Sequence, residues 1–177
     1  MTKAEYTRGQ MTAKAVASVY YSGWATETVP MTGRADLAVT LATLLADAGL
    51  TFASGDTLRL TSIDNAVTDF TYDELMGVPR YYYPAIMSDS DAGKTEILPF
   101  FVVKGNASET GEPGAGDALN TYRFIFGQSE DDYANHTKSG DKQPKWVTDV
   151  TVVKAAGGTG APGSGDIDGD GTVTITD

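Results

Sequence analysis

The segment "DLAVTLATLLADAGL" (36–50) decides the class of this fold, because it combines a helical pattern with a stop signal. From residue 40 onward, apolar side chains recur at intervals of three and four, which places them on one helical face. That face carries Leu41, Leu44, Leu45 and Ala48. Gly49 follows, and glycine commonly ends a helix because it adopts the left-handed conformation without strain. The segment therefore predicts a helix over 40–50 with its leucines in a core.

Around this helix the sequence predicts strands and one further short helix. Apolar runs, several of them alternating, predict strands at 13–21, 56–64, 96–106, 120–128 and 145–155. In "TYDELMG" (71–77), Thr71 is followed three residues later by Glu74, the capping-box pattern that begins a helix. A few short helices among five or six strands predict an α+β (mixed α/β) domain built on a mixed sheet.

Glycine, serine and proline mark a boundary near the end of the chain. The stretch "GGTGAPGSG" (157–165) has the composition of a flexible linker. It separates a predicted domain over 1–156 from a short segment over 166–177. We therefore expect a flexible C-terminal tail that does not pack on the domain.

Composition excludes several classes of partner and site. The 177 residues include 24 acidic and 13 basic side chains, for a net charge of −11, and no basic stripe occurs. Nucleic acid and anionic membrane surfaces are therefore unlikely partners on electrostatic grounds. The chain has no cysteine, which excludes disulfides and thiolate metal sites. It has no apolar run long enough to span a bilayer, and its N-terminus lacks the apolar region of a signal peptide.

The last twelve residues, "DIDGDGTVTITD" (166–177), have the ligand order of an EF-hand calcium loop. Carboxylates occupy positions 1, 3, 5 and 12, and Gly171 occupies position 6, where the loop turns sharply. The predicted metal ligands are Asp166, Asp168, Asp170, Thr172, Thr174 and Asp177. The alternative is a solvated acidic tail. The motif resembles one half of a dockerin repeat, which implies calcium-dependent attachment to a cohesin-like protein partner.

Calcium also bears on localisation. A site of this kind suits an environment where calcium is abundant, outside the cell. We therefore expect a secreted or cell-surface protein whose signal peptide lies outside this chain.

The order of the predicted elements over about 20–154 resembles the oxidoreductase molybdopterin-binding domain, which has the sulfite-oxidase fold. The resemblance rests on "DLAVTLATLLADAGL" and on "PKWVTDVTVV" (144–153). It implies a molybdenum-binding cysteine in the stretch that matches "YYSGW" (20–24), but Tyr20 stands at that position. A cluster of arginines would hold the pterin phosphate, but Arg34, Arg59, Arg80 and Arg123 are scattered along the sequence. We therefore expect a non-catalytic relative without molybdopterin and without catalytic residues.

Aromatic residues offer a possible ligand groove, because rings with polar tips suit sugars and peptides. The candidates are Tyr20, Tyr21, Trp24, Tyr81, Tyr82 and Tyr83, with Tyr133 nearby in the polar segment 129–144. The alternative is that these rings pack at the rim of the core.

The polar segment 129–144 contains two further candidates, a cation site and a catalytic histidine. Consecutive carboxylates at 130–132 do not converge easily on one ion, so a solvated loop is favoured over a second cation site. His136 is the only histidine, and the sequence places no nucleophile and acid around it. It is therefore predicted to be exposed and inert.

These observations favour a non-catalytic extracellular binding or scaffolding module with a calcium-binding, dockerin-like tail. Two alternatives are left open by the sequence. One is an oxidoreductase domain that uses a molybdopterin cofactor, and the other is a carbohydrate-binding module that uses the tyrosine-rich surface.

Overall fold

A computed structural model describes residues 2–108, 122–139, 142–155 and 171–176. The fold is α+β, with strands in the majority and a few short helices, as the sequence predicts. In chain order the elements are β1 (Thr2–Thr7), α1 (Arg8–Lys14), β2 (Val16–Thr26), β3 (Val29–Thr40), α2 (Leu41–Asp47), β4 (Thr57–Ser62), β5 (Val67–Thr71), α3 (Tyr72–Met76), β6 (Tyr81–Tyr82), the 3-10 helix η1 (Ile86–Ser88), β7 (Thr95–Glu96), β8 (Phe100–Ser108), β9 (Phe124–Ile125), α4 (Glu130–Ala134), β10 (Val147–Val153) and β11 (Gly171–Thr176).

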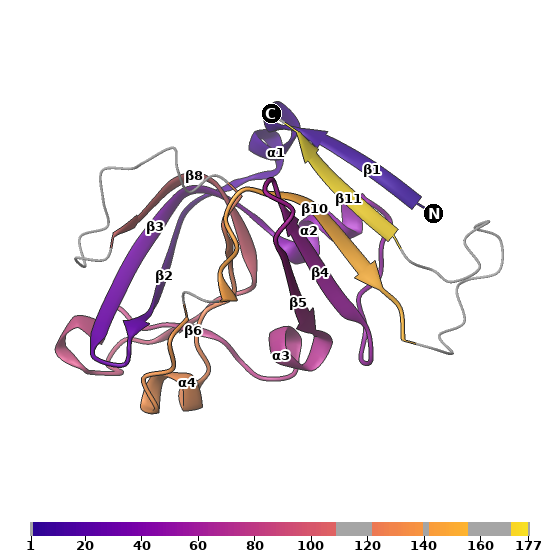
Figure 1. Ribbon diagram of the computed structural model, residues 1–177. Coiled ribbons are helices and arrows are strands. Elements are labelled where there is room, and N and C mark those ends of the chain that lie inside the picture. Colours follow the sequence, from indigo (N-terminus) through magenta and orange to yellow (C-terminus); the bar gives the residue numbers. More distant parts are fainter. Residues whose placement is uncertain (1, 109–121, 140–141, 156–170, 177) are drawn as a thin grey trace.

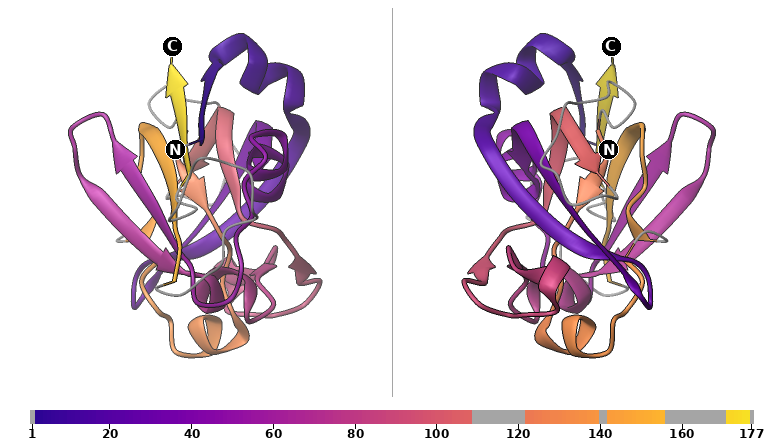
Figure 2. Two further views of the ribbon diagram at one scale, coloured as in Figure 1. Left: turned by 90° about the vertical axis from the view of Figure 1, so that its right-hand side faces the viewer. Right: turned by 90° about the vertical axis from the view of Figure 1, so that its left-hand side faces the viewer.

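Two main sheets build the domain. One has five strands in the order β1-β11-β10-β4-β5, and the other has four in the order β2-β3-β8-β9. A separate two-stranded ribbon pairs β6 with β7. In Figures 1 and 2, α1 and the end of β11 lie at one pole of the molecule, while α4 lies at the opposite pole. The two poles thus carry different parts of the chain.

The main core collects side chains from both sheets and from the helices. Leu58 and Leu60 of β4 join Phe101 of β8, Phe124 of β9 and Leu44 of α2 in one buried cluster. A second cluster, which includes Tyr21 and Phe100, is smaller and contains residues of the four-stranded sheet. Burial of these apolar surfaces is the main force that holds the two sheets together.

The two predicted helices are confirmed as α2 and α3. The contacts that form each helix join residues three or four positions apart. In α2, Leu41, Leu44 and Leu45 are buried, and Gly49 has a φ of +69°, as expected of a residue that ends a helix. In α3, the Thr71 hydroxyl accepts a hydrogen bond from the backbone N–H of Glu74 at 3.2 Å. The Glu74 carboxylate accepts one from the backbone N–H of Thr71 at 3.2 Å. The capping box therefore forms as predicted.

The predicted strands are found with different lengths. The strands at 56–64, 96–106 and 145–155 correspond to β4, β8 and β10. The run at 120–128 contains only the two-residue strand β9, and its first two residues lie outside the described residues. Strand β2 begins at Val16 rather than residue 13, because residues 8–14 form α1 under a capping box of Thr7 and Gln10.

Several elements were not predicted. The long strand β3 contains Pro30, Gly33 and charged residues, so its sequence does not alternate clearly. The segment 129–144, predicted to be a loop, contains helix α4, which begins with a capping box of Ser129 and Asp132. Aspartate at that position replaces the usual glutamate or glutamine, which explains why the signal was missed.

The largest difference concerns the C-terminal segment, which was expected to be a flexible tail. Residues 171–176 form β11, which pairs in parallel with β1 and in antiparallel with β10. Its Val173 and Ile175 belong to the main core and are 0% and 3% exposed. The expected boundary after residue 156 is therefore corrected for these six residues: they are part of the domain, because the alternation of "TVTIT" places two apolar side chains on the buried face.

Candidate functional site

The six aromatic residues of the predicted groove do not form one surface. Tyr21, Trp24 and Tyr83 are buried, at 1%, 2% and 1% exposed, and they pack in two different clusters. Burial raises the pKa of Tyr21 and of Tyr83 to about 12, since the phenolate would be poorly solvated there. These three rings are part of the packing, as the alternative interpretation of the sequence proposed.

Tyr20 and Tyr82 remain at the surface as a stacked pair. Their ring centroids lie 5.7 Å apart, and 36% of Tyr20 is exposed. Tyr20 also shares a hydrogen bond with Arg34 on the neighbouring strand, which helps to raise the pKa of that guanidinium. The Arg34 Nε donates to Asp36 at 3.0 Å. Tyr20, which stands at the expected cysteine position, is therefore half of an aromatic pair with a charged neighbour.

The His136 side chain is 35% exposed, and its ring also makes structural contacts. Its ring stacks on the indole of Trp24, with centroids 3.8 Å apart. Its Nδ1 lies 2.8 Å from the backbone oxygen of Glu27, and its Nε2 lies 3.5 Å from the Asp89 carboxylate. The ring therefore covers the buried indole and ties the segment after α4 to the turn between β2 and β3.

The four arginines considered as a phosphate site have separate partners. Arg59 of β4 forms a bidentate ion pair with Asp69 of β5: its Nε and Nη2 donate to the two carboxylate oxygens at 2.9 and 2.8 Å. Arg123 donates to the Gln143 side chain at 2.8 Å. Arg80 pairs with Asp132 of α4, and Arg34 with Asp36. Each guanidinium thus takes part in a local contact of its own.

Two of the three acidic residues at 130–132 have partners in ion pairs. Glu130 forms an ion pair with Lys94, and Asp132 forms one with Arg80. Asp132 accepts a hydrogen bond from the backbone N–H of Ser129 at 3.1 Å as part of the capping box. These two carboxylates therefore stabilise α4 and its contacts.

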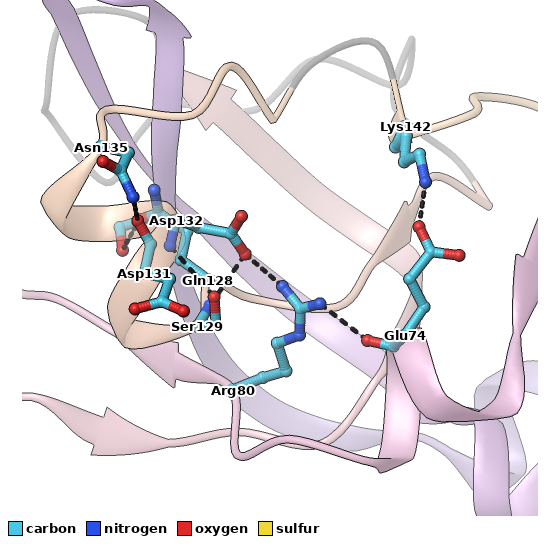
Figure 3. Close-up of polar contacts among 9 residues, drawn as sticks. Glu74, Arg80, Gln128, Ser129, Asp131, Asp132, Asn135 and Lys142 are labelled. Carbon is cyan, nitrogen blue, oxygen red and sulfur yellow. Dashed lines mark hydrogen bonds and ion pairs between the residues drawn. The ribbon is translucent and has the colours of Figure 1, made fainter.

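The most developed polar site lies at the pole of α3 and α4, and Figure 3 shows its contacts. Here a pocket of about 160 Å³ is lined by Glu74 of α3, Arg80, the segments 126–128 and 137–139, Asp132 of α4 and Lys142. Arg80 is only 8% exposed. We call this the Arg80 pocket. Sequence reasoning missed it because its lining comes from several segments that are separated along the chain.

Two ion pairs frame the Arg80 pocket. Arg80 contacts the Asp132 carboxylate through Nη1 and donates through Nη2 to the backbone oxygen of Glu74 at 2.7 Å. The Glu74 carboxylate pairs with Lys142. Burial opposes ionisation of Glu74, but the hydrogen bonds from Lys142 and from the backbone of Thr71 outweigh it, so its pKa is lowered. The pocket therefore keeps its charges in fixed positions.

The predicted calcium ligands lie only partly within the structure. Asp166, Asp168, Asp170 and Asp177 are outside the described residues. The other two, both on β11, have hydroxyl partners on β10. The Thr172 hydroxyl lies 3.1 Å from that of Thr151, and the Thr174 hydroxyl donates to Asp149 at 2.9 Å. In the described part of the chain, no group of three or more acidic, histidine or cysteine side chains is arranged to hold a metal ion.

Gly171 has a role other than the sharp turn expected at position 6 of the loop. It is the buried first residue of β11, and a side chain there would run into Leu50. A larger residue at position 171 therefore requires the end of the Leu50 side chain to move.

Comparisons with family models, with curated proteins and with solved structures found no match to this chain. Across the described ranges, none of the helices has both the length and the apolar character needed to cross a bilayer.

Proposed function

We propose that this chain is a non-catalytic extracellular binding or scaffolding module whose C-terminal segment 166–177 binds calcium. The observation that carries the proposal is the spacing of the carboxylates in "DIDGDGTVTITD", at positions 1, 3, 5 and 12 with glycine at 6. Its resemblance to half of a dockerin repeat favours a protein partner of the cohesin-like kind. Abundant extracellular calcium favours a secreted or cell-surface location.

The surroundings of the titratable groups support a binding role over catalysis. His136 is stacked on Trp24, and both of its ring nitrogens face oxygens that fix its orientation. The carboxylates of the Arg80 pocket are paired with cations. A general base must be placed within reach of a substrate proton, whereas the contacts of these groups hold them in structural positions.

The lack of cysteine supports the proposal that the protein does not use a molybdopterin cofactor. Molybdenum in the family that the sequence resembles is ligated by a thiolate, and this chain has none. We therefore expect purified protein to carry no molybdopterin. Stoichiometric molybdenum by mass spectrometry of protein from a cofactor-producing host would overturn this and favour the oxidoreductase alternative.

Strand β11 places a condition on calcium binding. An EF-hand loop uses the backbone oxygen of residue 7, here Thr172, as a ligand. Thr172 lies in a strand with a neighbour on each side, opposite Lys3 of β1 and Thr151 of β10, so its carbonyl is directed at a neighbouring strand. Complete ligation therefore requires residues 171–176 to leave the sheet. Calcium binding and β11 are alternatives for the same residues.

The test is a titration of the whole chain with calcium chloride, with magnesium chloride as the matched control. We expect weak binding, because the ion must compete with the sheet. A calcium ion that binds residues 166–177 only when they lie outside the sheet also binds them in the unfolded chain, and not in the intact sheet, so calcium should lower the thermal midpoint. The double variant Asp168→Asn/Asp170→Asn should abolish both effects, while Asp91→Asn, an exposed acid elsewhere, should not.

Two outcomes separate the alternatives. A raised thermal midpoint on calcium addition would show that the ion binds with β11 in place, and the exclusive relation would be wrong. No heat and no shift at millimolar calcium would leave only the solvated acidic tail that the sequence also allowed.

A glycan is the second candidate ligand, and one observation favours it. The stacked pair of Tyr20 and Tyr82 is partly exposed beside Arg34 and Asp36, a combination of aromatic faces and hydrogen-bonding groups that suits a sugar. A glycan array with the wild type and with Tyr20→Ala tests it. Tyr72→Ala, which removes a tyrosine that packs against Phe52, is the matched control.

A further inference from the structure

Strand β11 fills the interior of the five-stranded sheet, although it comes from the end of the chain. It pairs with β1 along its whole length and with β10 over Asp149–Val152. Figure 1 shows it between these two strands. A strand missing from this place would leave two facing rows of backbone N–H and C=O groups unpaired, and such rows pair readily with another strand. We call the place between β1 and β10 the β11 slot.

The contacts that hold β11 in the slot are made by residues 171–176. Val173 and Ile175 are buried in the main core, at 0% and 3% exposed. On the other face of the strand, the Thr174 hydroxyl donates to Asp149 at 2.9 Å. Two backbone ladders, two apolar anchors and a hydroxyl contact thus recognise a segment of six residues. The same segment from another molecule presents the same groups.

The connection between β10 and β11 is much longer than their geometry needs. Val152 and Gly171 lie opposite each other in the antiparallel pair, yet residues 153–170 join them. Neighbouring antiparallel strands are joined directly by turns of about two to five residues. The stretch 157–165 has the Gly/Ser/Pro composition of a linker, which predicts a long and variable reach. The covalent connection therefore does not dictate which molecule's slot β11 enters.

A closed chain and a pair of exchanged chains differ chiefly in the tether. A second copy offers the same ladders and the same apolar positions, so the slot contacts contribute equally to both arrangements. In the closed chain, a flexible linker holds β11 near its own slot at an effective concentration on the order of millimolar. Two chains that each carry a net charge of −11 also repel. Exchange should therefore grow as the protein concentration approaches this range and as salt screens the charge.

We propose that the β11 slot accepts the β11 segment of a second copy, so that copies of this chain associate by strand exchange. The partner surface is the extended segment 171–176, which is recognised by its addition to the sheet as a strand. Strand exchange goes beyond the proposed function, because it gives the module a partner with its own sequence. It does not depend on calcium, and it is tested in EDTA.

Covalent trapping tests the exchange, because the chain has no cysteine of its own. Thr151 of β10 and Thr172 of β11 lie opposite each other, with their hydroxyls 3.1 Å apart. Facing residues of antiparallel strands lie within the Cα separations that a disulfide bridges. Full-length Thr151→Cys and Thr172→Cys, one of them labelled with nitrogen-15, are mixed in a glutathione redox buffer. Exchange places the two thiols side by side in different chains, and the label separates mixed from like-chain dimers by mass.

Mixed dimers should exceed the statistical proportion, and their yield should rise with protein concentration and with added sodium chloride. Thr95→Cys, at an exposed position of β7 outside the five-stranded sheet, replaces Thr151→Cys as the control for random collisions and should give only statistical dimers. The double variant Thr151→Cys/Thr172→Cys should close an internal disulfide at low concentration, which verifies the register. Folded mixtures are compared with mixtures refolded together from urea, so that slow release of β11 does not hide the exchange.

A further variant removes the strand that competes for the slot. Val173→Asp in the Thr151→Cys chain places a charge at a buried position of its own β11 and leaves β1 and β10 unchanged. At about 0.1 mM protein, the yield of mixed dimer should then increase about tenfold, because the tethered strand no longer competes at its millimolar effective concentration. Thr176→Asp adds the same charge at an exposed position and should leave the yield unchanged.

The result does not depend on one variant. If the chain with Val173→Asp fails to fold alone, the comparison of Thr151→Cys with Thr95→Cys still decides. Dimers in the statistical proportion after joint refolding, or no dimers at about 1 mM protein, would overturn the proposal. Neither result bears on calcium binding, which the titration of the whole chain measures separately.

Discussion

The two poles of the molecule are stabilised in different ways. At one pole, β11 closes the five-stranded sheet between β1 and β10, and it contributes Val173 and Ile175 to the main core. At the other pole, α3 and α4 each begin with a capping box, and Arg80 forms an ion pair with Asp132 of α4. The first depends on apolar burial between segments far apart in sequence, and the second depends on polar contacts with directed geometry.

This difference bears on the proposed calcium binding. Calcium is proposed to compete for β11, so its effect should be seen on the five-stranded sheet and not at the pole of α3 and α4. Four changes to the chain test whether the poles are as different as they look, in order of decreasing expected effect.

Removal of residues 171–177 should have the largest effect. It exposes the positions of Val173 and Ile175, whose burial is worth about 3–6 kcal/mol together, and it removes the strand that lies beside β1 in the sheet. Urea unfolding and hydrogen exchange of residues 2–7 measure the two consequences. Deletion of 158–163, which shortens the Gly/Ser/Pro stretch but keeps β11, is the control and should change stability little. An unchanged midpoint after removal of 171–177 would show that the segment is an independent tail.

Loss of the Arg80–Asp132 ion pair should have the second largest effect. Arg80→Met leaves Asp132 without its cation and should cost about 2–4 kcal/mol, below the full effect of a deeply buried pair because Asp132 is partly exposed. Arg59→Met breaks an ion pair in which both side chains are more than 40% exposed, and it should cost less than about 1 kcal/mol. Equal losses for the two variants, measured by urea unfolding, would mean that Arg80 is less buried than described.

Loss of the helix cap at Thr71 should have a moderate effect. Thr71→Ala removes the acceptor for the Glu74 backbone N–H and should cost about 1 kcal/mol. Thr71→Ser keeps a hydroxyl in the same place and is the matched control. If serine is no better than alanine in thermal unfolding, packing of the threonine methyl group and not the cap explains the loss.

The smallest effect is expected from the pH dependence of Asp56, which lies near the end of β10. Burial opposes ionisation of this carboxyl, but hydrogen bonds from Lys154 and from the backbone of Ala53 and Ala155 outweigh it and lower its pKa. A lowered folded-state pKa gives stability that is present above the unfolded-state value of about 4 and is lost as the pH falls through the folded-state value. The difference in thermal midpoint between wild type and Asp56→Asn should therefore shrink between pH 7 and pH 3. A difference that stays constant over this range would show that the Asp56 charge does not contribute.

The predictions made from sequence succeeded where the signal lies within a few residues. The leucine face of α2, the glycine after it and the capping box of α3 each involve side chains three or four positions apart. Such contacts form whatever the rest of the chain does, so periodicity and spacing were sufficient to find them. The α+β class followed from the same local patterns.

Pairing between distant segments is what the sequence did not show. Thr2 lies opposite Gly171 in the sheet, and the lining of the Arg80 pocket runs from residue 74 to residue 142. The segment "TVTIT" has the alternation of a strand, but only the neighbours β1 and β10 turn it into one. The aromatic residues give the converse case: their composition suggested a groove, whereas tertiary packing buries Tyr21, Trp24 and Tyr83.

The sequence by itself therefore determined the helices α2 and α3, the class of the fold, the net negative charge and the calcium-type spacing of the last carboxylates. The tertiary structure alone decided that residues 171–176 belong to a sheet, that His136 covers an indole, and that Arg80 is buried beside Asp132. The physical reason is the range of the interactions. Caps and helical faces depend on nearby residues, whereas strand order, burial and the partners of a charged group depend on segments that only folding brings together.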